Sequence, residues 1–318
     1  MPVSFTSSCP SDVVQEPWAS WSTDKEGLRI NTGMSLAEVE HVYEPSKGRL
    51  LALAAQQRHR DPNSPPLTSH NLLVITIHWL RKQPSYDVMA YTFRHSSTYW
   101  HHMVRQVVAA LDDCCFALFV KPLASDAPTS IFFNNVKIIV DTTFVPLPKN
   151  TFVREDYHHK SPTKAAWKYE IACDFAHNII SCSRGFHGGQ HDMRIIRESG
   201  LLKQSSPTAL IMGDKGYRGK LGIVVPASKK AKVSREVRNL EEEKQRGHEL
   251  QHERAAVENI NQRAKQWAVA AEVWLGDRDP TLFMDAVMRV VCVLANVILQ
   301  SHPLRAREHR SVDGGSVS

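Results

Sequence analysis

The sequence predicts a mixed α/β protein, in which a sheet with flanking helices follows a small all-helical domain. Three observations lead to this prediction. Apolar residues recur at helical spacing over residues 67–113, β-branched runs bounded by turn residues begin after residue 131, and residues 234–273 form one long, highly charged helical stretch. Strands that come first and then alternate with helices are typical of a mixed α/β sheet.

The composition is that of a globular protein with a weak preference for polyanions. Of the 318 residues, 42% are hydrophobic and 23% are charged, which excludes an intrinsically disordered chain. Lys and Arg outnumber Asp and Glu by 39 to 33, and the formal net charge is +6. This excess is compatible with a nucleic-acid partner but does not identify one.

The cysteines and the apolar segments indicate an intracellular protein without a membrane partner. The six cysteines contain no CxxC pair, so we expect them to be reduced. The N-terminus lacks a basic-then-apolar signal pattern. The longest apolar run, residues 287–299, contains Arg289 and is too short to cross a bilayer, so it predicts a buried helix. In a eukaryote we would expect the nucleus.

The two ends of the chain have the composition of loose segments. Residues 1–66 are rich in turn formers and end in RHRDPNSPP. We expect a poorly ordered or loosely packed extension here, with little order before Leu36. Residues 301–318 are expected to form a flexible, basic tail.

Three helical segments follow and define an expected domain over residues 67–125. They read NLLVITIHWLRKQ, SYDVMAYTF and SSTYWHHMVRQVVAALDD. The third begins near Ser97, and its apolar stripe consists of Trp100, Val104, Val107 and Val108.

Such a trio has the layout of a helix-turn-helix domain, whose third helix enters the major groove of DNA. In that arrangement His101 and Arg105 would contact the groove or its phosphates. A helical bundle that only packs on the next domain explains the same pattern, so both interpretations stay open.

From residue 131 the pattern changes to strands. VKIIVD predicts a strand that ends at Asp141, and TALIMGD predicts a strand that ends at Asp214. Between them we expect strands over residues 166–175 and 178–186, joined by a turn, and a helix over 191–199. GIVVPA predicts a last strand, and the long helical stretch follows, with a possible break at Gly247.

The two strand-end aspartates are candidate functional residues. Open α/β sheets place ligands at the carboxyl ends of their strands, and a carboxylate beside apolar surface needs a partner or a cation. On the long helix, Arg254, Glu258 and Lys265 fall on one face, because the helix turns by roughly 100° per residue. Exposed Arg-Glu pairs are common, so this spacing alone is weak.

Together these residues resemble a known family. Asp141 in VDTT, Asp214 in GDKGY and the spacing Arg254-x3-Glu258-x6-Lys265 are similar to the three blocks of transposases with an Asp-Asp-Glu triad, in the PIF/Harbinger group and the related bacterial insertion-sequence transposases. The resemblance covers about residues 131–275, and the helices before it resemble the helix-turn-helix region of the family.

A further block and two departures qualify the resemblance. His191-Asp192, after the glycines of GFHGGQ, is similar to an additional block of the group. Thr142 stands where the family usually has glycine, and Gln251 stands where the bacterial signature usually has tyrosine. Neither departure removes a metal ligand, but both concern the positioning of the DNA strand.

The resemblance implies a ribonuclease H-like nuclease domain over residues 126–300 and a metal-dependent DNA endonuclease or transposase. Asp141, Asp214 and Glu258 would be catalytic and would hold two Mg²⁺ or Mn²⁺ ions, with Asp192 as the alternative second aspartate. A domesticated DNA-binding descendant without nuclease activity is the alternative.

The resemblance also implies contacts with DNA and with other proteins. The residues expected to contact DNA in the nuclease domain are Arg254, Lys265, Lys215, Arg218 and Lys220. A separate DNA-binding protein and a second copy of this chain are further expected partners. The histidines of HGGQH could form a zinc site, but no second ligand pair lies near them in the sequence.

Overall fold

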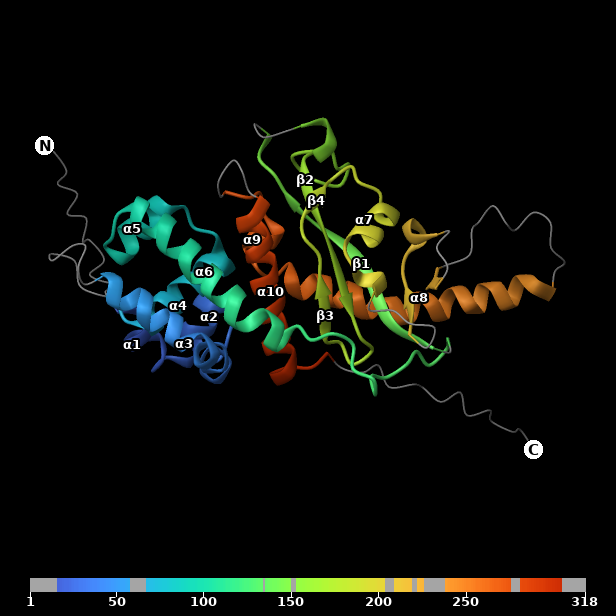
Figure 1. Cartoon of the computed structure of the whole chain (residues 1–318), viewed down its shortest axis with the longest axis horizontal. Coiled ribbons are helices and arrows are strands. Elements are labelled where there is room, and N and C mark those ends of the chain that lie inside the picture. Colours follow the sequence, from blue (N-terminus) through green and yellow to red (C-terminus); the bar gives the residue numbers. More distant parts are fainter. Residues whose placement is uncertain are drawn as a thin grey trace, which may run out of the picture.

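The computed structural model describes residues 16–57, 67–133, 135–149, 153–203, 209–218, 222–225, 238–275 and 281–304. A bundle of helices occupies one end of the molecule and a sheet with its own helices occupies the other (Figure 1). One long apolar helix, α10, stands between the two parts. This arrangement confirms the mixed α/β class, with a helical region first in the chain.

The N-terminal residues are better packed than their composition predicted. Residues 16–57 form α1 (Pro17–Trp21), α2 (Lys25–Thr32) and α3 (Leu36–Gln57). Their apolar side chains Trp21, Leu28, Met34, Val39 and Leu50 are buried in the main core. The expectation of a loose extension is therefore wrong for residues 16–57, because these spaced apolar residues pack on α4 and α6. Residues 1–15 and 58–66 lie outside the described ranges.

The three expected helices are present as α4 (Ser69–Lys82), α5 (Tyr86–Phe93) and α6 (Ser97–Phe119). The N-cap residues of the three helices are Thr68, Ser85 and Ser96. The side-chain hydroxyl of each accepts a hydrogen bond from a backbone N–H in the first turn of its helix. The predicted stripe of α6 is buried, as expected. Helix α6 packs against α3, α4, α5 and α10, so it is the central helix of the bundle.

The sheet has six strands, β1 (Val136–Pro146), β2 (Ala166–Cys173), β3 (Ile179–Cys182), β4 (Phe186–His187), β5 (Leu210–Met212) and β6 (Ile223–Val224). Their order is β3-β2-β1-β5-β6, and β4 pairs with β2 off this path. Strands β1, β2 and β3 are antiparallel, whereas β1, β5 and β6 are parallel.

Strand β1 is longer than predicted. It was expected to end at Asp141, but it continues to Pro146 because β2 pairs with it from Ile139 to Pro146. On the other side, the parallel pairing with β5 stops at Ile139 and Met212. Asp141 therefore lies inside a strand, at the level where the neighbouring strand β5 has ended.

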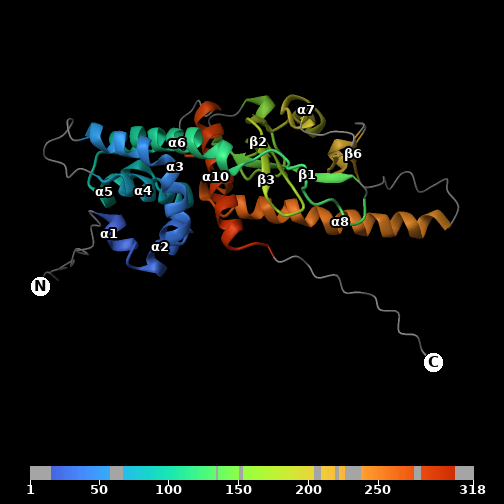
Figure 2. The ribbon, with the colours of Figure 1, turned by 60° about the horizontal axis from the view of Figure 1, so that its bottom comes forward.

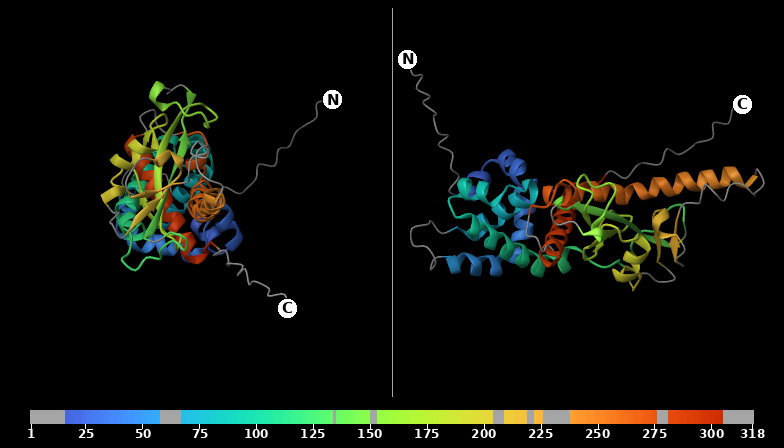
Figure 3. Two further views of the ribbon diagram at one scale, coloured as in Figure 1. Left: turned by 90° about the vertical axis from the view of Figure 1, so that its right-hand side faces the viewer. Right: turned by 90° about the horizontal axis from the view of Figure 1, so that it is seen from above.

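The two faces of the sheet are covered by different helices. Figures 2 and 3 show α8 (Arg238–Ala264) along one face and α7 (Asp192–Glu198) on the other. On the α7 face, a small hydrophobic cluster includes Ile138, Val140 and Ile211 of the sheet. The short helices η3 (Leu201–Lys203) and η4 (Lys215–Tyr217) add buried side chains to this cluster. Ile139 and Met212 instead join the main core. Another short helix, η2 (Arg154–Asp156), precedes β2.

Helix α8 continues through Gly247 and ends at Ala264, so the suggested break at Gly247 is absent. The short α9 (Ala268–Ala271) follows, and Trp267 is the N-cap residue between the two helices. Residues 234–237 of the expected stretch lie outside the described ranges.

Helix α10 (Thr281–Ser301) is the predicted buried helix. By length and composition it is the described helix that could span a membrane, but 78% of its most apolar window is buried inside the protein. Arg289, the charged residue within the apolar run, has a partner on α6. Its guanidinium donates to both Asp112 carboxylate oxygens, at 2.7 and 2.5 Å. Most of the expected tail, residues 305–318, lies outside the described ranges.

One core spans the helical bundle and the α8 face of the sheet. The buried Asn296 of α10 joins them: its amide nitrogen donates to the carbonyls of Phe119 and Ile179, both at 2.9 Å, and its amide oxygen accepts from Ile179 N at 2.8 Å. The expected boundary near residue 125 is thus a change of secondary structure without a break in the core.

Candidate active site

Asp141 is a largely buried carboxylate that faces α8. Successive side chains of a strand alternate between faces, and Asp141 shares the face of Ile139. Its Oδ2 accepts from the Asn261 amide nitrogen at 3.2 Å, and its Oδ1 accepts from Thr142 N at 2.8 Å. Burial raises the pKa of Asp141 to about 6, against the lowering effects of the Thr142 amide and of Arg254.

Asp214 lies beside Asp141 for a topological reason. Ile139 and Met212 are the last parallel pair of β1 and β5, and each aspartate follows its member of that pair by two residues. Asp214 caps η4, and its Oδ1 accepts from Gly216 N at 2.6 Å. The carboxylates of Asp214 and Asp192 both contribute to the raised pKa of Asp141. We call Asp141, Asp192 and Asp214 the acidic cluster.

Gly216 allows two of these carboxylates to approach each other. A Cβ atom at this position would lie 2.4 Å from Asp192 Oδ2 and 2.8 Å from Asp214 Oδ1. A side chain at this position would therefore have to displace both carboxylates. The glycine of GDKGY lets Asp192 and Asp214 keep the positions that they have here.

Asp192 has a different environment from the other two aspartates. The N-cap of α7 is His191, whose ring nitrogen accepts from Met193 N, and Asp192 is the first helical residue. The ammonium of Lys168, a nearly buried side chain of β2, lies 2.5 Å from Asp192 Oδ1. The Thr142 hydroxyl donates to the same oxygen at 3.1 Å. Asp192 thus already has a fixed cationic partner.

Glu258 lies on the face of α8 that meets the acidic cluster, but it is not enclosed there. Arg254 and Asn261, which both interact with Asp141, stand four residues before it and three residues after it. The Glu258 side chain is 55% exposed and lies 3.8 Å from the Arg254 guanidinium. Among the described residues, no group of three or more His, Cys, Asp or Glu side chains is arranged to hold a metal ion.

Lys265 is occupied by the protein backbone. Its ammonium donates to the carbonyls of Phe144 and Ala270, which lie on β1 and α9. Burial lowers the pKa of Lys265 to about 8. This lysine therefore ties the end of α8 to the sheet, which is a structural role that the family spacing did not suggest.

Several exposed cations lie near the acidic cluster. Lys215 and Arg218 belong to or follow η4, and both are exposed, whereas Lys220 lies outside the described residues. The loop from His158 to Lys164 is held by internal backbone hydrogen bonds, among them His158 N to Lys164 O at 3.0 Å. Burial lowers the pKa of His158, and the charges of Lys168, His159 and Lys160 lower it further, to about 4. The charge of Asp192 raises it, so this loop lies close to Asp192.

Helix α6 has a poor surface for DNA. The guanidinium of Arg105 stacks on Phe283 of α10 at 4.4 Å, and the ring of His101 packs against Tyr86 of α5 at 5.2 Å. The exposed positions of this fully described helix are Thr98, His102, Gln106, Ala109, Asp113, Ala117 and Leu118. None is Lys or Arg, and Arg105, the arginine of this helix, is only partly exposed.

The histidines of HGGQH have structural partners. His187 pairs with the nearly buried Asp156 at 2.7 Å, and His191 caps α7. A Cβ atom on Gly188 would lie 2.5 Å from the Asp156 carbonyl, so close packing requires the first glycine. These contacts explain the motif without the zinc site that its composition suggested.

Glu170 is a buried acid that sequence reasoning missed. It lies on β2 opposite Thr142, is 2% exposed, and its Oε2 accepts no hydrogen bond from the described residues. Burial raises its pKa to about 7, with a further contribution from Asp192. The sequence contained a weak indication of this residue. In the strand AWKYEIAC, Glu170 stands two residues after Lys168, so both side chains lie on the same face of the sheet.

Glu170→Gln is expected to stabilise the protein above pH 7. The folded pKa lies above the ordinary value of 4.5, so the stability due to protonated Glu170 is present below about pH 4.5 and is lost as the pH rises through about 7. A neutral amide avoids this loss, which is roughly 1–3 kcal/mol. Urea unfolding at pH 5 and pH 8 measures it. Glu272→Gln, at an exposed position, is the control, and an equal pH dependence in wild type and Glu170→Gln would contradict the expectation.

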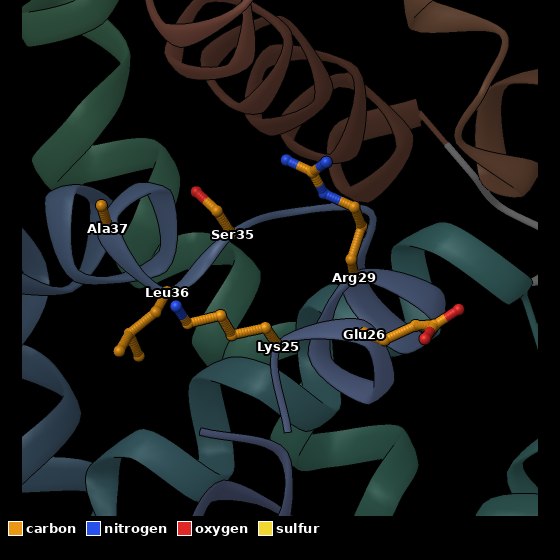
Figure 4. Close-up of a pocket in the computed structure, with 6 residues that line it drawn as sticks. All are labelled: Lys25, Glu26, Arg29, Ser35, Leu36 and Ala37. Carbon is orange, nitrogen blue, oxygen red and sulfur yellow. The ribbon is translucent and has the colours of Figure 1, made fainter. Parts of the chain in front are cut away.

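Cavities formed by described residues lie on the helical bundle. One, of about 590 Å³, is lined by Lys25 and Arg29 of α2 and by the start of α3 (Figure 4). Arg29 also lies 3.0 Å from His302. Another of about 590 Å³ includes Trp79, Tyr86 and Leu275. Neither includes a member of the acidic cluster.

Comparison with known families assigns the segment that carries the acidic cluster. Residues 140–296 match a family described as DDE superfamily endonuclease. No curated protein and no solved structure matches the chain. The matched segment includes Asp141, Asp192, Asp214 and Glu258. This segment of the chain is therefore similar to DDE superfamily endonucleases.

Proposed function

We propose that the chain is a divalent-metal-dependent nuclease that cleaves DNA phosphodiester bonds, as DDE transposases do. The observation that carries this proposal is the placement of Asp141 and Asp214. The parallel pairing of β1 with β5 brings two carboxylates together from positions far apart in the sequence. One of them, Asp141, is largely buried, and no lysine or arginine of the described residues makes a hydrogen bond to it. Such a carboxylate is a candidate ligand for a cation.

The ligand type of the acidic cluster, carboxylate oxygen, suits a hard divalent cation. Carboxylate oxygens are the ligands preferred by Mg²⁺ and Mn²⁺. Asp141 and Asp214 would hold the ions, with Glu258 joining them if the exposed side chain turns away from Arg254. Asp192 is the weaker candidate because Lys168 already neutralises it. When bound, such ions activate the attacking hydroxyl and stabilise the leaving oxygen.

The finer assignment also rests on the topology and the motifs. Three antiparallel strands followed by two parallel ones, with helices on both faces, support a ribonuclease H-like sheet. The spacing of Asp141, Asp214, Arg254 and Glu258 supports the PIF/Harbinger group. We retain this group as part of the proposal.

DNA is the proposed substrate because cations surround the acidic cluster. Lys215 and Arg218 lie on one side, and the loop with His159, Lys160 and Lys164 lies on the side of Asp192. Lysine and arginine side chains neutralise the phosphates of a DNA strand and release its counterions. The bundle helix α6 has no such surface, so we place DNA contact on the nuclease part of the chain.

A DNA-binding protein without nuclease activity is the second candidate. The half-exposed Glu258, paired with Arg254, favours it, because the third acid of the triad is not brought into the cluster. The same cationic surface would serve this function.

Incubation with supercoiled plasmid and with linear DNA separates the two candidates. The nuclease is expected to nick DNA with Mg²⁺ or Mn²⁺ and to stop when EDTA is added, because its chemistry requires bound ions. The purified full chain should be assayed with an Asp141→Asn preparation as the control for contaminating nucleases. Salt-sensitive DNA binding with no metal-dependent nicking would favour the binding protein.

A further inference from the structure

The side chain of Asn261 lies between the residues of the family signature on α8. It follows Glu258 by three residues and precedes Lys265 by four, so it shares their face of the helix. Its amide nitrogen lies 3.2 Å from Asp141 Oδ2. Of the α8 side chains, it is the one with a hydrogen bond to the acidic cluster among the described contacts.

The other half of the Asn261 amide lacks a partner. Its Oδ1 is buried and accepts no hydrogen bond from the described residues. An unpaired buried acceptor is unfavourable, because it has lost its hydrogen bonds to water. The amide nitrogen of Asn261 is hydrogen-bonded, whereas its oxygen is buried and unpaired. This difference suggests that the oxygen binds another group when the site is occupied.

A cation held between Asn261 and Asp141 would give this amide oxygen a partner. Turning the amide by half a turn exchanges its nitrogen and oxygen, and Oδ1 would then lie about 3.2 Å from Asp141 Oδ2. Two neighbouring oxygen ligands of an octahedral ion, each at about 2.1 Å, are separated by about 3.0 Å. The observed spacing is therefore close to that of two ligands of the same ion.

We propose that Asn261 is an additional member of the metal site, which supplies an amide oxygen beside Asp141. Without a cation, its amide nitrogen holds Asp141 Oδ2 in place. With a cation, its oxygen becomes a neutral hard ligand from the helix that also carries Glu258. The inference rests on the proposed nuclease function, and it gives α8 an enclosed ligand where Glu258 is half exposed.

Direct binding of Mn²⁺ to the full chain tests this assignment without DNA. In titrations followed by calorimetry or by electron paramagnetic resonance, Asn261→Ala should weaken Mn²⁺ binding by about tenfold or more. Asn261→Asp should bind Mn²⁺ at least as tightly as wild type, because it keeps an oxygen and adds a charge. Gln262→Ala, an exposed amide on the same helix, should bind as wild type does.

Each outcome separates this inference from the proposed function. Wild-type affinity in Asn261→Ala would overturn the inference and leave the nuclease proposal standing. The absence of Mn²⁺ binding in wild type would overturn both. If Asn261→Ala is unfolded by circular dichroism, Asn261→Asp decides, since weaker binding in this folded variant would also overturn the assignment.

Discussion

Asp141→Asn is expected to reduce DNA cleavage by more than about a hundredfold, because it replaces a metal-binding carboxylate; losses of 10- to 100-fold are typical for residues that only support a ligand. DNA affinity should stay the same or increase, since the substitution removes a negative charge that repels phosphate. Nicking of supercoiled plasmid measures cleavage, and fluorescence anisotropy with labelled duplex measures affinity. A parallel loss of cleavage and affinity would mean that Asp141 is structural.

The neighbouring aspartates provide the controls for this experiment. Asp214→Asn should behave like Asp141→Asn, because both residues stand at the same level beyond the last β1-β5 pair. Asp126→Asn changes an exposed carboxylate outside the acidic cluster and should leave cleavage unchanged. Asp192→Asn should reduce cleavage less than either cluster partner, since Lys168 holds Asp192 in a salt bridge.

Asn296→Leu is expected to cost about 3–5 kcal/mol of folding stability. The substitution keeps a similar side-chain size but removes three hydrogen bonds that join α10 to Phe119 and Ile179. Buried groups left unpaired cost about 1–3 kcal/mol each, and the sum is a large part of the stability of a typical domain.

Urea unfolding followed by circular dichroism measures this loss. Gln300→Leu lies on the same helix at an exposed position and should change stability by less than about 0.5 kcal/mol. A loss below about 1 kcal/mol for Asn296→Leu would mean that water replaces the missing bonds. If only the sheet unfolds at lower urea in Asn296→Leu, the helical bundle folds without this contact.

The sequence alone predicted the features that depend on neighbouring residues. Periodicity located α4, α5, α6 and α10, since the burial of an amphipathic stripe follows from spacing along a helix. Runs of β-branched residues located β1, β2 and β5. Composition failed for residues 16–57, because their few apolar side chains are buried by α4 and α6, which come later in the chain.

The tertiary structure decided which side chains of the candidate site meet. Motif spacing named Asp141, Asp192 and Asp214, but only the pairing of β1 with β5 and the packing at Gly216 bring them together. Spacing also assigned Lys265 to DNA, whereas the end of α8 directs its ammonium to backbone carbonyls. Asn261 and Glu170 carried no motif, and their importance depends on burial and on partners across the sheet, which a linear pattern does not encode.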